Sequence, residues 1–130
     1  MEEAVFAAHS GTRYLVLAAA GFAAVAALIG SRQRRAGSSG LERVLGIVFI
    51  SVLDLQVLLG IVLLTLRPFY GALIGHIVLM IGALVSAHVG SIVARKRATT
   101  GTGSRVRLRS ILIALVFVVA GITALNRPVF

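Results

Sequence analysis

Four long apolar runs constrain the fold of this chain more than any other feature. A helix needs about 20 mostly apolar residues to cross the hydrocarbon core of a bilayer. The runs, at residues 14–29, 44–66, 72–94 and 106–125, reach that length with their flanks. Because 58% of the residues are hydrophobic and only 13% are charged, a soluble core could not be covered by polar surface. The sequence therefore predicts an integral membrane protein with one all-α domain over residues 1–130.

The connections between the runs predict how the helices are arranged. Each connection is rich in charged or turn-forming residues, and Pro68 in the short second connection prevents one continuous helix. A short connection makes its two helices antiparallel neighbours. We expect an up-down-up-down four-helix bundle, whose helices cover residues 12–30, 42–66, 71–94 and 106–126.

The distribution of basic residues predicts the orientation. Ten of the 13 Lys and Arg residues flank the first and third connections, and only Arg13, Arg67 and Arg127 flank the other side. Cytoplasmic loops of membrane proteins are enriched in Lys and Arg. This predicts a multi-pass protein of the bacterial inner (cytoplasmic) membrane, with both basic loops in the cytoplasm and both termini outside. The acidic start, Met1-Glu2-Glu3, is unlike a signal peptide, so we expect the first run to be retained.

Charge and cysteine content exclude several functions. Topology and attraction to anionic lipid headgroups explain the net charge of +9, so we expect the lipid bilayer as partner and no nucleic acid. The chain has no cysteine, which excludes disulfides, thiolate metal sites and cysteine nucleophiles. It also contains no Walker loop, no zinc-protease histidine pair and no nucleophile elbow.

Polar residues inside the apolar runs are the functional candidates, because ionisable groups are costly at mid-bilayer. They are Asp54, Gln56, His76 and His88, with His9, Arg13, Thr123 and Asn126 nearer the predicted outer face. The run 111–120 has no polar group, and we expect the fourth helix to be a lipid-facing wall or a subunit contact.

His9 and His76 fall in the same half of the membrane, His9 just before the first helix and His76 near the start of the third. The first and third helices are diagonal in an up-down bundle, so these imidazoles could face each other as the axial ligands of a haem. Two alternatives stay open: a buried His76 bonded to a neighbouring helix, and a solvated His9 cap beside Ser10-Gly11-Thr12.

The remaining candidates have weaker assignments. Met80 lies within about 40° of His76 on a helical wheel, on a stripe of small residues that suits either a flat ring or helix packing. Arg13 could pair with a haem propionate or extend to the interface. Asp54 could orient a ligand, as carboxylates do for metal-bound imidazoles, or only tie helices together. His88 is a further candidate: a quinone contact, a proton site or a partner for Asp54.

The segments His9-Ser-Gly-Thr-Arg-Tyr, Asp54-Leu-Gln-Val-Leu-Leu-Gly and His76-(x11)-His88-Val-Gly resemble those of small bacterial four-helix b-type cytochrome-like membrane proteins. The resemblance covers the first three helices. It implies that His9 and His76 are axial ligands of the haem b iron, with His88 as a third possible metal ligand, and that electrons are exchanged with quinone or a neighbouring redox subunit. The chain has three histidines, whereas a two-haem arrangement needs four.

The leading hypothesis is therefore a haem-binding electron-transfer or accessory subunit, rather than a stand-alone enzyme. A second is a small oligomeric transporter or channel that uses Asp54, Gln56 and a histidine. A third is a cofactor-free structural or assembly subunit, in which the polar residues join helices. Partners would be redox-complex subunits or further copies of the chain.

Overall fold

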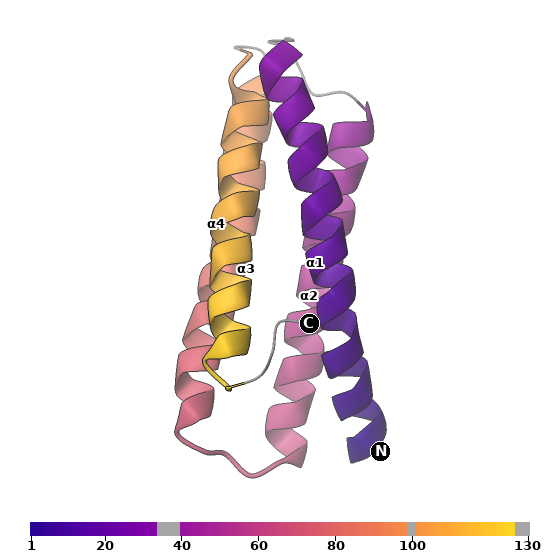
Figure 1. Cartoon of the computed structure of the whole chain (residues 1–130), viewed down its shortest axis with the longest axis vertical. Coiled ribbons are helices and arrows are strands. Elements are labelled where there is room, and N and C mark those ends of the chain that lie inside the picture. The colour runs from indigo at the N-terminus through magenta and orange to yellow at the C-terminus, as the bar shows by residue number, and fades with distance from the viewer. Residues whose placement is uncertain (34–39, 99–100, 127–130) are drawn as a thin grey trace.

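The residues described by the computed structural model, 1–33, 40–98 and 101–126, form four helices. They are α1 (Glu2–Gln33), α2 (Gly40–Leu66), α3 (Ala72–Lys96) and α4 (Gly103–Thr123). Consecutive helices are antiparallel, so the helices pack as an up-down bundle (Figure 1). The predicted all-α class and up-down arrangement are confirmed.

All four of the described helices are long and apolar enough to span a membrane. Most of their side chains point outward and are apolar, such as Phe22 and Val116, each about two-thirds exposed. Large apolar surface on every side of a bundle is stable only where lipid covers it. The chain is therefore a multi-pass membrane protein in contact with a bilayer.

The core of the bundle consists mainly of small side chains. On α1, Val16, Ala20, Ala23 and Ala27 are buried at spacings of three and four residues, which places them on one face. Gly90 on α3 packs so closely against Ser110 on α4 that an added Cβ would overlap the serine side chain. Small residues let membrane helices approach closely and gain packing energy. By contrast, α2 and α3 pack least closely of the neighbouring pairs.

The first helix begins earlier than the sequence predicted. We placed its start near residue 12 and His9 before it, but α1 begins at Glu2 and includes His9. Glu2 and Glu3 lie in the first turn, where negative charge stabilises the helix dipole. The hydroxyl of Thr12, predicted to belong to a cap, instead donates to the His9 carbonyl three residues earlier, a local bond that a helix tolerates.

The ends of the other helices follow local signals. After α2, the five residues 67–71 make the short connection that Pro68 predicted. The α4 helix ends at Thr123 rather than 126, and Asn126 has a φ of 54°, a left-handed conformation that asparagine tolerates where helices stop. Arg34, Arg35 and Arg127 of the basic-residue prediction lie outside the described residues.

The two ends of the bundle differ in charge. The end with the first and third connections, the basic end, has Arg32, Arg95 and Lys96 in the last turns of α1 and α3. The opposite end, the N-terminal end, contains the start of α1 and the connection between α2 and α3 (Figure 1). There Arg67 binds Glu2, with 2.9 Å between Nε and Oε1, and lies over the ring of Phe6. This contact joins the end of α2 to the start of α1.

Candidate functional site

A cavity of about 290 Å³ lies inside the bundle toward its N-terminal end. Side chains of every described helix line it, and most of them are apolar. The polar lining residues include His9, Arg13, Gln56 and His76. Ile61 and Ile81 also line the cavity and are more than half exposed on α2 and α3, so the cavity opens between these helices. The volume is at the lower end of the range for small-molecule sites, and the opening leaves room at the side.

His9 is held against α2 by two hydrogen bonds. Its Nδ1 lies 3.1 Å from the backbone carbonyl of Gln56, and the Gln56 side-chain amide donates to the His9 carbonyl at 3.0 Å. The Thr12 hydroxyl, whose one proton lies between the His9 carbonyl and the side-chain oxygen of Gln56, adds a further contact with α2. The imidazole lies over Gly60, where an added Cβ would approach Cε1 to 3.1 Å. Gln56 and Gly60 thus fix the position of His9 against α2.

His76 is held against α4 in a similar way. Its Nδ1 lies 2.8 Å from the backbone carbonyl of Gly121, and the absence of a side chain at Gly121 leaves room for the imidazole and for Met80. The expectation that α4 is only a wall or a contact surface was wrong. A backbone carbonyl such as that of Gly121, just after the apolar run, accepts without any polar side chain, and the buried Val118 and Ile122 show that one face of α4 lines the interior.

The two hydrogen bonds fix the tautomer of each histidine. A carbonyl oxygen can only accept, so the Nδ1 of each imidazole bears a proton, and Nε2 is the nitrogen left for a ligand role. The ring centroids of His9 and His76 are 6.4 Å apart, with their planes at 80°. The structure therefore brings the two predicted histidines together at one cavity, although the same separation also occurs in ordinary aromatic pairs.

Arg13 also lines the cavity, one turn after His9. Its terminal NH2 donates to the Tyr14 hydroxyl at 2.7 Å, and the guanidinium lies over the Tyr14 ring. Its Nε is buried and has no hydrogen-bond partner among the described residues. A buried N–H without an acceptor costs about 1–3 kcal/mol, more when charged. An anionic or carbonyl group bound in the cavity would remove that cost.

Met80 and the stripe of small residues on α3 face the interior. Met80 lines the cavity, and Ala83, Ala87 and Gly90 are buried in the bundle. Gly82 and Gly90 pack against Phe117 and Ser110 of α4. The lower part of the stripe therefore serves helix packing, and only Met80 belongs to the cavity.

Asp54 and His88 lie apart from the histidine pair. The Nε2 of His88 is 2.8 Å from the Oδ1 of Asp54, and both side chains are about half exposed on the outside of α2 and α3. Neither residue lines the cavity. The structure thus unites Asp54 with His88, one of the options that the sequence left open, and places both away from His9 and His76.

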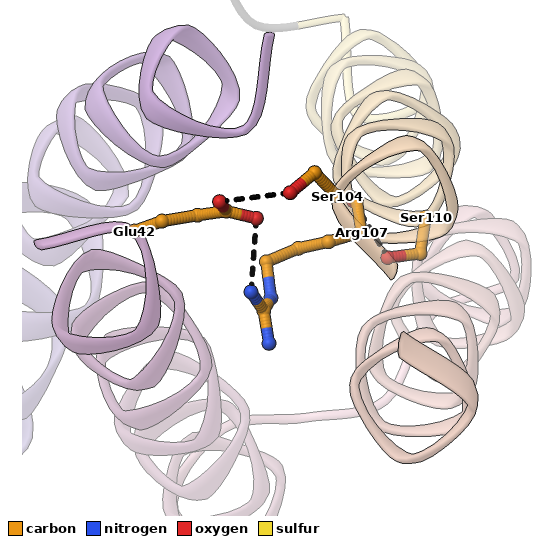
Figure 2. A network of polar contacts seen from close by, with 4 residues as sticks. All are labelled: Glu42, Ser104, Arg107 and Ser110. Carbon is orange, nitrogen blue, oxygen red and sulfur yellow. Dashed lines mark hydrogen bonds and ion pairs between the residues drawn. The ribbon is translucent and has the colours of Figure 1, made fainter. Parts of the chain in front are cut away.

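A buried ion pair at the basic end was missed from the sequence. Figure 2 shows Glu42 of α2 pointing across the bundle toward Arg107 and Ser104 of α4. Each of them donates to one carboxylate oxygen of Glu42 at 2.9 Å. We had explained all basic residues here by topology and headgroup attraction, but Arg107 is only 6% exposed. The available signal was a lone acidic residue at the start of a span whose end of the bundle is otherwise basic.

No three His, Asp or Glu side chains come together as a metal site within residues 1–33, 40–98 and 101–126. A cofactor that brings its own equatorial ligands needs only two protein ligands. The fold defines the chain as a multi-pass membrane protein built as a helical bundle. Comparison with family models, curated proteins and solved structures found no match.

Proposed function

We propose that the chain is a b-type haem protein in which His9 and His76 are the axial ligands. The observation that supports this most is the tautomer of the pair: each imidazole at the cavity gives its Nδ1 proton to a backbone carbonyl and keeps Nε2 basic. Metal-bound histidines almost always donate their other N–H to a carbonyl or carboxylate, which fixes the ring and raises its basicity.

The separation of the rings suits the same role. Two metal–imidazole bonds of about 2 Å, with about 1 Å from each nitrogen to its ring centre, give about 6 Å between centroids. The observed separation is 6.4 Å. A structural pair of histidines would be satisfied at many separations, whereas two ligands of one metal ion require this one.

The lining of the cavity, mostly apolar with a few polar groups, also supports the proposal. Its walls near the pair are apolar residues such as Leu53 and Val118, which suit a macrocycle. Arg13, whose buried Nε has no partner among the described residues, would bind a propionate. When bound, haem would supply a one-electron couple, and the chain would supply ligation, orientation and exclusion of water. Such a protein would serve as an electron-transfer or accessory subunit.

We further propose that both termini face outward from a bacterial inner membrane. The basic end, with Arg32, Arg95 and Lys96, would then lie in the cytoplasm. The cavity would lie in the outer half of the bilayer. Gly71→Cys, in the exposed connection between α2 and α3, should then react with an impermeant thiol reagent in intact cells. Gly40→Cys, at the start of α2, should react only after the cells are permeabilised, and the reverse pattern would refute this orientation.

The transporter alternative has less support. Within one chain Gln56 lies inside the bundle while Asp54 lies outside it, so the two do not line a common path. The Glu42–Arg107 pair occupies the interior at the basic end (Figure 2). No continuous polar path between the two ends is therefore evident among the described residues.

A reduced-minus-oxidised absorption spectrum tests the haem proposal. The protein, produced with sufficient haem, should show sharp visible bands of six-coordinate haem b. His9→Ala and His76→Ala should each lose them, and added imidazole should partly restore them. His88→Ala is the matched control, because this third histidine lies outside the cavity, and its bands should be unchanged. A colourless folded protein, or equal loss in all three variants, would refute the proposal.

A further inference from the structure

The Asp54–His88 pair lies on the outer surface of the bundle, where contact between polar groups and lipid costs free energy. Asp54 is at the middle of α2, and His88 is eight residues before the end of α3, so both lie well inside membrane-spanning helices. Their side chains are 48% and 47% exposed. Ionisable residues in membrane helices almost always face protein or a water-filled cavity, because the hydrocarbon cannot solvate them. The hydrogen bond between them offsets only part of this cost.

The residues around the pair form an apolar surface, here called the α2–α3 face. Leu58 lies four residues after Asp54 on α2, and Val85 lies three residues before His88 on α3. Each is therefore on the same side of its helix as the polar residue, and each is more than half exposed. The cavity opening between Ile61 and Ile81 lies on the same side of the bundle. A protein surface that covered this face would shield the polar pair and close the opening.

A second copy of this chain could cover the α2–α3 face, because its own Asp54 and His88 are complementary to those of the first copy. Because Asp54 and His88 are hydrogen-bonded at 2.8 Å, they lie at one depth in the membrane. A two-fold axis along the membrane normal preserves depth, so it can bring Asp54 of one copy opposite His88 of the other. The bond within one chain uses Oδ1 and Nε2, which leaves Oδ2 of Asp54 and Nδ1 of His88 available for contacts with the second copy. Each acidic side chain would then lie opposite a basic one, so the two surfaces are complementary.

We propose that two copies of the chain associate through the α2–α3 face, about a two-fold axis along the membrane normal, with their Asp54–His88 pairs meeting at the centre. This interface is independent of haem binding, since neither residue lines the cavity. Polar side chains are among the main forces that join membrane helices, where lipid removes the hydrophobic drive for association.

Cysteine cross-linking in native membranes tests this interface, and the chain has no cysteine of its own. Leu58→Cys and Val85→Cys, on the α2–α3 face, should form disulfide-linked homodimers on mild oxidation. Phe22→Cys on α1 and Val116→Cys on α4 are matched controls of at least equal exposure, and they should remain monomeric. Dimers from the controls alone, or cross-links only to a different protein, would overturn the proposal.

The dissociation constant of the dimer can be measured by fluorescence energy transfer between labelled chains in vesicles of decreasing protein-to-lipid ratio. The double variant Asp54→Leu with His88→Leu should raise the dissociation constant about 10-fold, as expected for the loss of two interhelical hydrogen bonds in a membrane. Both positions are exposed, so leucine fits there without repacking the core. An unchanged dissociation constant, or a wild-type chain that is monomeric at every dilution, would overturn the proposal.

Discussion

Breaking the Glu42–Arg107 pair should destabilise the protein far more than removing any other charged group that the structure describes. The side chains are 0% and 7% exposed, and 2.9 Å separates Oε1 of Glu42 from an Arg107 nitrogen. Breaking a buried ion pair by removing one partner costs about 3–5 kcal/mol. We therefore expect Arg107→Met to lower the free energy of unfolding by about that amount, with Glu42→Leu having a similar effect.

The double variant is the decisive measurement. Replacing a buried ion pair by apolar residues of similar volume is often neutral or stabilising, because the desolvation cost of both charges disappears. The Ser104 hydroxyl, which donates to Glu42 at 2.9 Å, loses its acceptor in this variant, at a cost of about 1–3 kcal/mol. Glu42→Leu with Arg107→Met should therefore be at least about 1 kcal/mol more stable than either single variant.

Unfolding in mixed micelles with increasing dodecyl sulfate, followed by circular dichroism, gives the three free energies. A double-mutant cycle then isolates the coupling between the two side chains. Single variants within about 0.5 kcal/mol of the wild type would show that the pair is solvated. Costs that simply add in the double variant would show that the two side chains do not interact, and either result would refute the reasoning.

Three further changes test the packing, each by the same unfolding measurement. Gly90→Ala should cost about 1–3 kcal/mol, because the new methyl group would overlap Ser110 and separate α3 from α4. Gly11→Ala is its matched control: nothing lies within 4 Å of the added group, so the better helix former should stabilise α1 by about 0.5–1 kcal/mol. Arg67→Ala should cost no more than about 1 kcal/mol, because Arg67 and its partner Glu2 are 34% and 48% exposed to solvent. A loss at Gly11 equal to that at Gly90, or a large loss at Arg67, would contradict these assignments.

The sequence was sufficient for the membrane class and the up-down bundle because both depend on long-range patterns. Run length and hydropathy determine which segments can span a bilayer, and Pro68 determines where one hairpin turns. The start of α1 was mispredicted because Ser10-Gly11-Thr12 has the composition of a cap. In the structure these residues continue a helix that also contacts α2 through Thr12 and His9.

The candidate site was only partly predictable, because a sequence identifies side chains but not the backbone groups that bind them. Histidines stand out in an apolar run, and equal height on diagonal helices was enough to pair His9 with His76. The groups that hold them are backbone carbonyls of Gln56 and Gly121, which every residue has and no pattern marks. The inward direction of Arg107 was equally hidden, because an arginine near a helix end can reach headgroups or a buried carboxylate.

The spacing between His9 and His76 is determined by residues far from both. His9 is fixed to α2 and His76 to α4, so each hairpin positions one imidazole. The distance between the hairpins depends on how closely α1 packs against α4, since α2 and α3 pack less closely. That closeness comes from small buried side chains such as Ala23 and Ala114. The alanine core therefore also positions the two imidazoles, at the separation that the proposed haem iron would require.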